Sequence, residues 1–77
     1  MIRELDRVVL ERDLPEFGLA RGDLGTVVLV HNAGAGYEVE FMTLDGETVA
    51  VTTLDRNEVR EVNGREIAHA RGLAHVA

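Results

Sequence analysis

The sequence contains no Cys, Trp, Ser or Lys, and these absences exclude several classes of site. Without Cys there is no disulfide framework and no thiolate metal centre, which suits a protein of the reducing cytoplasm. Without Ser or Cys, the common catalytic triads lack their nucleophile. We therefore expect a cytoplasmic protein that is not an enzyme and that carries no cofactor and no metal ion.

The charge of the chain is strongly biased towards acid. The formal net charge of the 77 residues is −6, and all eight basic residues are Arg. Residues 1–62 hold 13 acids against six Arg, whereas residues 63–77 carry a charge of +1. Because an acidic surface repels phosphate backbones, we expect a protein partner and not a nucleic acid. No apolar run approaches the roughly 20 residues that span a bilayer, so no membrane contact is expected.

Five segments have the composition and alternation of β-strands. The predicted strands are residues 5–11, 25–31, 37–43, 48–54 and 58–62. In the third of them, Tyr37, Val39 and Phe41 point to one face, and we expect them in the core. Glu38 and Glu40 point to the opposite face, which we expect to be solvated. Their spacing of two residues superficially resembles the carboxylate pair of a hydrolase, but a domain this small has little room for a cleft that holds a sugar.

Turn residues separate the predicted strands. Residues 12–23 contain the one Pro of the chain and are predicted to form a long loop. Asn32–Gly36 is a Gly/Asn turn, Asp45–Gly46 is a hairpin signal, and residues 55–57 form a short turn or one turn of 3₁₀ helix. The continuous apolar run of residues 25–31 predicts a strand buried on much of both faces.

Two glycines precede that second strand in the stretch Arg21-Gly22-Asp23-Leu24-Gly25. A phosphate-binding loop would need its glycines to lead through Lys and Ser or Thr into a helix, whereas these lead into a strand. An Arg-Gly-Asp integrin ligand would rest on three residues only. We interpret Gly22 as part of a backbone turn and Gly25 as a close approach or a bulge at the strand start.

This pattern predicts an all-β fold, a small five-stranded SH3-like barrel over residues 1–62, followed by a C-terminal extension over residues 63–77. The extension is Ala-rich and predicts either a short helix over residues 65–71, with Gly72 just past its end, or a disordered tail. Some of the apolar residues of the extension would form a stripe at helical spacing, from among Ile67, Ala70, Leu73, Ala74 and Val76. This stripe would pack on the barrel or dock on a second chain.

Several motifs between Val8 and Val62 together resemble those of small bacterial SH3-like proteins of unknown function. The motifs are the Val-rich first strand, Leu-Pro-x-x-Gly-Leu, Gly-Asp-x-Gly-Thr-Val, Tyr-Glu-Val-Glu-Phe and the closing strand after Leu-x-x-x-Glu-Val-Arg. The resemblance implies an SH3-like barrel without an assigned activity. It also implies a partner encoded beside it, as in a toxin–antitoxin-like pair. The glycine turn is more loosely similar to those of KOW domains and of SH3-like photosystem and nitrile-hydratase subunits.

The remaining candidates are single side chains. His69 and His75 are six residues apart and do not share a helix face, and His31 stands alone, so we interpret all three as surface residues. Phe17 either caps the barrel or stands out as an anchor for a partner. With no Trp and one Tyr, the aromatic groove that binds proline-rich peptides is missing.

These observations predict a small protein-interaction module whose acidic face, long loop and extension contact a protein partner. The candidate partner-binding residues are Glu16, Phe17, Leu19, Arg21, Glu38, Glu40, Ile67 and Leu73. One alternative is a nucleic-acid or ribosome-associated KOW-type module, which would need a convergent set of arginines: Arg7, Arg12, Arg21, Arg56 and Arg60. An accessory subunit of a larger enzyme is a further alternative, and a homodimer could form by pairing of edge strands.

Overall fold

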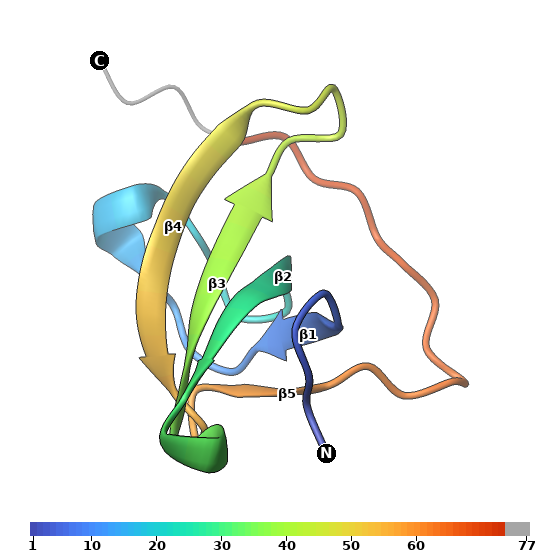
Figure 1. Ribbon diagram of the computed structural model, residues 1–77. Coiled ribbons are helices and arrows are strands. Elements are labelled where there is room, and N and C mark those ends of the chain that lie inside the picture. Colours follow the sequence, from blue (N-terminus) through green and yellow to red (C-terminus); the bar gives the residue numbers. More distant parts are fainter. Residues whose placement is uncertain (74–77) are drawn as a thin grey trace.

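The computed structural model describes residues 1–73. They form one antiparallel sheet of five strands in the order β4-β3-β2-β1-β5 (Figure 1). The strands are β1 (Arg7–Leu10), β2 (Leu24–His31), β3 (Gly36–Met42), β4 (Thr48–Asp55) and β5 (Val59–Glu61). Residues 1–73 contain two short 3₁₀ helices and no α-helix. The predicted all-β fold of five strands is therefore confirmed.

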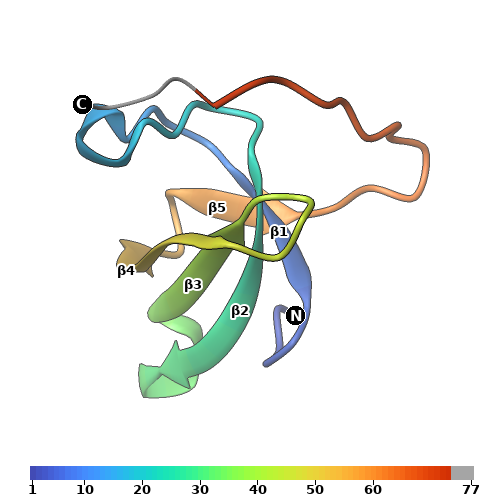
Figure 2. The same cartoon turned by 90° about the horizontal axis from the view of Figure 1, so that it is seen from above.

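The sheet curves strongly, but it is not closed into a barrel. In Figure 1, β5 runs across the direction of β4, and the view from above in Figure 2 shows the strands wrapping around a common interior. The end strands β4 and β5 each pair with one neighbour only. An open sheet leaves the outer edge of each end strand without a strand partner.

The core lies on the concave side of the sheet, where the predicted alternation of β3 is confirmed. Tyr37, Val39 and Phe41 are buried, whereas Glu38 and Glu40 lie on the other face. One cluster unites the buried side chains: Val8, Leu10, Leu14, Leu19, Val27, Tyr37, Val39, Phe41, Ala50, Leu54 and Val59.

The expectation that the second strand is buried on much of both faces is wrong. Val27 is fully buried, but Val28 and Leu29 are 39% and 45% exposed. A register shift against β3 between Val27 and Leu29 places both of these exposed residues towards solvent. The physical reason is that one antiparallel sheet folded over one core covers only its inner face.

Gly25, at the start of β2, is needed for close packing. A Cβ atom at this position would lie 2.5 Å from Val39 Cγ1 and 2.9 Å from Phe41 Cε1. Both distances are far below van der Waals contact, so only glycine lets β2 approach the side chains of β3. Of the two roles considered for Gly25, the structure shows the close approach.

The loop over residues 12–23 is more ordered than a plain loop. It contains a 3₁₀ helix at Pro15–Phe17, which ends at Gly18 with φ +69°. Leu14 and Leu19 then form an antiparallel bridge, and both side chains are buried. The loop therefore folds back onto the core and closes one end of it.

The helix expected over residues 65–71 is absent. Apart from a turn that begins at Asn63, residues 63–73 have no regular secondary structure, and they run back across the molecule from β5 (Figure 1). We call residues 63–73 the strap. Ala74, His75 and Val76, which belong to the predicted apolar stripe and histidine set, lie outside the described residues.

Candidate functional site

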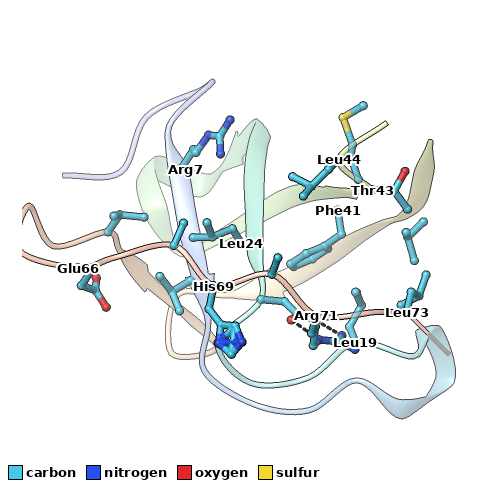
Figure 3. Close-up of a pocket in the computed structure, with 18 of the residues that line it drawn as sticks. Arg7, Leu19, Leu24, Phe41, Thr43, Leu44, Glu66, His69, Arg71 and Leu73 are labelled. Atoms are coloured by element: carbon cyan, nitrogen blue, oxygen red, sulfur yellow. Dashed lines mark hydrogen bonds and ion pairs between the residues drawn. The ribbon is translucent and has the colours of Figure 1, made fainter. Parts of the chain in front are cut away.

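The strap crosses the molecule from β5 to the loop over residues 12–23 and encloses a groove against the sheet (Figure 3). The groove has a volume of about 1080 Å³ and is open to solvent. Its floor comes mainly from β1, β2 and β3, with Val49 of β4 and Arg60 of β5, and the β3–β4 turn forms one side. Two arginine–carboxylate pairs, one near each end, attach the strap to the rest of the protein.

The Arg60–Glu66 pair, which we call the first clasp, fixes the start of the strap. Arg60 on β5 donates two parallel hydrogen bonds to the Glu66 carboxylate, 2.8 Å from Nη1 to Oε1 and 2.6 Å from Nη2 to Oε2. The backbone N–H of Asn63 donates to Oε1 at 2.7 Å. These bonds, those from Arg60 above all, hold the pKa of Glu66 at about 2. Glu66 is therefore ionised at neutral pH, and the first clasp is closed.

The Arg71–Asp23 pair, the second clasp, fixes the end of the strap. Arg71 donates to Asp23 at 2.9 Å from Nε to Oδ1 and at 2.5 Å from Nη2 to Oδ2. Its Nη2 also donates to the Gly18 carbonyl at 3.1 Å, and the Ala20 N–H donates to Asp23 Oδ2 at 2.8 Å. Burial alone would raise the pKa of Asp23, but the bonds from Arg71 and then Ala20 lower it below its ordinary value.

The second clasp also explains the Arg-Gly-Asp stretch. Asp23 N–H donates to the Ala20 carbonyl at 3.0 Å, and Gly22 adopts φ +97°. This is the predicted backbone turn, in which only glycine reaches positive φ without strain. Because the Asp23 carboxylate is bound to Arg71, the three residues are not displayed as a free Arg-Gly-Asp ligand.

Both apolar and charged side chains line the groove, and the strap leaves part of its apolar surface uncovered. Leu24, Met42 and Val62 line it and remain 37%, 49% and 42% exposed. Ile67, near the middle of the strap, is 93% exposed. At the end of the strap, Leu73 lies beside Gly18. The strap is thus held by polar contacts near its ends, and apolar surface beneath it stays in contact with water.

The predicted partner-binding residues lie in three places. Leu19, Ile67 and Leu73 line the groove, although Leu19 is 6% exposed and packs in the core. Glu16, Phe17 and Arg21 lie outside the groove in the loop over residues 12–23, where Phe17 is half-exposed. Glu38 and Glu40 lie on the outer face of β3. The eight residues therefore do not form one site.

On that outer face, Glu38 is the centre of a small polar network. His31 Nε2 lies 2.7 Å from Glu38 Oε2, and the Thr53 hydroxyl donates to both carboxylate oxygens at 2.9 Å. The bond from His31 and then that from Thr53 lower the pKa of Glu38 below its ordinary value. The Thr48 hydroxyl donates to Glu40 at 2.7 Å. His31 is a surface histidine, as expected, and its partner is a carboxylate.

Sequence reasoning missed both clasps and most of the groove floor. The available signal for an ionic attachment was the opposite sign of the two charges: residues 63–77 carry +1, whereas residues 1–62 hold 13 acids against six Arg. It did not name the partners, because Asp23 and Arg71 are separated by 48 positions along the chain. The exposed floor residues Leu24 and Met42 lie at strand ends, where alternation does not distinguish a groove from a solvated surface.

Within residues 1–73, no group of three or more His, Asp or Glu side chains is arranged to hold a metal ion. The same residues contain no helix long and apolar enough to cross a membrane. His69 lines the groove without a ligand set around it.

Comparison with known proteins gives a family. Residues 4–61 match the family described as Domain of unknown function (DUF4926). The chain belongs to this family. No curated protein and no solved structure matches it, so the SH3-like assignment remains a prediction. The DUF4926 match includes Asp23 and Arg60, whereas Glu66 and Arg71 lie beyond it. Each clasp therefore joins the DUF4926 region to the strap.

Proposed function

We propose that this DUF4926 protein is a protein-interaction module that takes an apolar segment of a partner protein into the groove under the strap. The observation that carries the proposal is the exposed apolar floor beneath a strap that is held by ion pairs. Contiguous exposed apolar surface in a concave site is typical of binding sites. Polar clasps can open without exposing a packed core, so a partner can enter from the side or displace the strap.

The charges support a protein partner over a nucleic acid. A KOW-type module would need free arginines converging on one face, yet Arg12 is paired with Glu58 at 2.7 Å. Arg60 is likewise engaged, by Glu66 at 2.6 Å and by Glu11 at 3.3 Å. With a net charge of −6, a basic partner is favoured by long-range attraction.

The module works in the cytoplasm, a reducing compartment that suits a chain without Cys, and it has no catalytic activity of its own. Its partner is the product of a neighbouring gene, in a toxin–antitoxin-like pair. A basic protein of that kind would meet an acidic binding module with complementary charge.

The groove is tested by site-specific cross-linking in the full chain. A photoreactive phenylalanine at position 67 would be compared with one at position 29, on the outer face of β2. We expect one protein to be cross-linked from position 67 only, through an apolar segment identified by mass spectrometry. The purified partner is then titrated against the variants Met42→Asp and Leu29→Asp, whose parent side chains are 49% and 45% exposed.

Met42→Asp places a charge in the groove and should weaken binding about tenfold or more, because an unpaired carboxylate on an apolar contact surface is desolvated. Leu29→Asp should leave the affinity unchanged. Equal affinity of both variants, or cross-linking from position 29 alone, would refute the groove as the binding site. Circular dichroism of both variants controls for loss of fold.

A further inference from the structure

The outer edge of β4 is a second surface, which none of residues 1–73 covers with backbone hydrogen bonds. β4 pairs with β3 alone. Among the described residues, no backbone hydrogen bond connects Thr48–Leu54 with a segment other than β3. In an edge strand, alternate residues direct their N–H and C=O groups away from the sheet. These groups of β4 are in position to pair with an added strand.

β4 also has few of the features that protect sheet edges. Thr48–Leu54 contains no Pro and no charged residue, and most of its side chains are β-branched. One register shift lies near its start, and from Ala50 to Asp55 its pairing with β3 is regular. The opposite edge differs, because β5 has three residues and carries Arg60 of the first clasp. Short length and charge are typical edge protection, and the stretch Thr48–Leu54 of β4 has neither.

Carboxylates surround this open edge. Glu38 and Glu40 stand on the outer face of β3 directly opposite Thr53 and Val51 of β4. Glu47 precedes the strand, and Asp55 ends it. In residues 1–73, no arginine forms an ion pair with any of these four carboxylates, and the one basic side chain paired with them is that of His31, 2.7 Å from Glu38. Arg56, directly after the strand, is the one basic residue adjoining it in sequence.

We propose that β4 binds an extended strand of a basic protein, which extends the sheet. Lys or Arg at alternate positions of the added strand would lie beside Val51 and Thr53, and their long side chains would reach across these residues towards Glu38 and Glu40. Main-chain hydrogen bonds would supply affinity, and the carboxylates would select the partner by charge. Val49 is the one β4 residue that lines the groove, so the edge over Ala50–Asp55 lies outside the groove and does not depend on it.

A second copy of this chain fits the edge less well. Two copies would bring two net charges of −6 together. In an antiparallel pair of β4 strands centred on Val51, Glu47 would also lie opposite Asp55 at both ends. Like charges directly opposite each other destabilise a strand pair. The charge distribution therefore favours a basic partner over self-pairing.

The test uses synthetic nonapeptides with the full-length protein. The first peptide, the probe, alternates Val and Arg. The second is the same peptide with Pro in place of its central residue, and the third carries Glu in place of every Arg. We expect the Val/Arg peptide to slow amide hydrogen exchange at alternate residues of Ala50–Asp55. The Pro and Glu peptides should bind at least about tenfold more weakly. The Pro peptide cannot form an unbroken hydrogen-bonded strand, and the Glu peptide is repelled by the carboxylates around β4.

Val51→Lys and Leu29→Lys form the matched pair of variants, since their parent side chains are 50% and 45% exposed and only the first lies on the edge strand. Val51→Lys should weaken the Val/Arg peptide about fivefold or more, and Leu29→Lys much less. Unchanged exchange in β4, equal binding of the Pro peptide, or protection located in the groove would overturn the proposal. If analytical sedimentation shows a dimer of the parent protein and the Val51→Lys variant is a monomer, the edge of β4 binds a second copy of this chain. That result would overturn the proposal of a basic partner.

Discussion

Breaking the second clasp should release the end of the strap while the sheet stays folded. The substitution Arg71→Gln keeps much of the apolar stem but removes the charge and the two bonds to Asp23. Hydrogen bonds to charged groups contribute about 1.5–3 kcal/mol, and exposed ion pairs about 0–1 kcal/mol. The Arg71 side chain is 41% exposed and that of Asp23 is 18% exposed, so this pair lies between those limits. We expect a loss of about 1–2 kcal/mol, or roughly 5- to 30-fold in the closing equilibrium of the strap.

Backbone NMR chemical shifts of residues 66–73 follow that equilibrium, because only Glu66 among them donates a backbone hydrogen bond whose exchange could be measured. Urea unfolding measures the effect on the whole protein. A double-mutant cycle with Asp23→Asn isolates the pair, because asparagine keeps an oxygen that can accept the bond from the Ala20 N–H. Arg65→Gln is the matched control, since Arg65 also lies in the strap and forms no ion pair among residues 1–73. A coupling energy below about 0.5 kcal/mol, as independent sites show, would refute the clasp as the attachment of the strap.

Three further predictions follow from single contacts. Because the pKa of Glu66 is about 2 against an ordinary 4.5, its stabilising effect is complete above about pH 4.5 and disappears as the pH falls towards 2; Glu66→Gln should remove this acid-dependent part of the thermal melting profile. Gly25→Ala should destabilise the protein by about 1–3 kcal/mol in urea unfolding, because its Cβ would lie 2.5 Å from Val39 Cγ1; a stability equal to that of the parent would show that β2 can move aside. Phe41→Ala, at a side chain 2% exposed, should cost about 3–5 kcal/mol, and a smaller loss in the same assay would mean that the core collapses into the space.

The local sequence pattern was sufficient to predict which face of β3 is buried and where the β3–β4 hairpin turns. Alternation along residues 37–43 placed Tyr37 and Phe41 in the core and Glu38 outside it, as the structure shows. The Asp45–Gly46 signal marked the hairpin, where Gly46 adopts φ +93°. Both features depend on neighbouring residues alone, through the pleat of a strand and the freedom of glycine at positive φ.

Burial along β2 could not be predicted in the same way. The apolar run of residues 25–31 is compatible with one or two covered faces, and only the register against β3 decides between them. The shift between Val27 and Leu29 turns one of these residues inward and the other outward. Such a shift depends on a partner strand, so the sequence of β2 does not contain it.

The strap illustrates the same limit for the candidate site. Its Ala-rich composition favours a helix, but a helix rises about 1.5 Å per residue and an extended chain about 3.3 Å. The strap is attached through Glu66 at the first clasp and through Arg71 at the second, so the residues between them must cross the groove. An extended chain spans this distance with fewer residues than a helix does. A helix of so few residues is too weak to resist two bidentate ion pairs.

The sequence by itself determined the strand content, the faces of β3, the hairpin turns and the acidic charge, because each follows from local conformational preference or simple addition. The open sheet, the groove and the free edge of β4 were decided by tertiary structure alone. They depend on pairs such as Arg71 with Asp23, whose separation along the chain leaves no periodic signal, and on which strand ends the sheet.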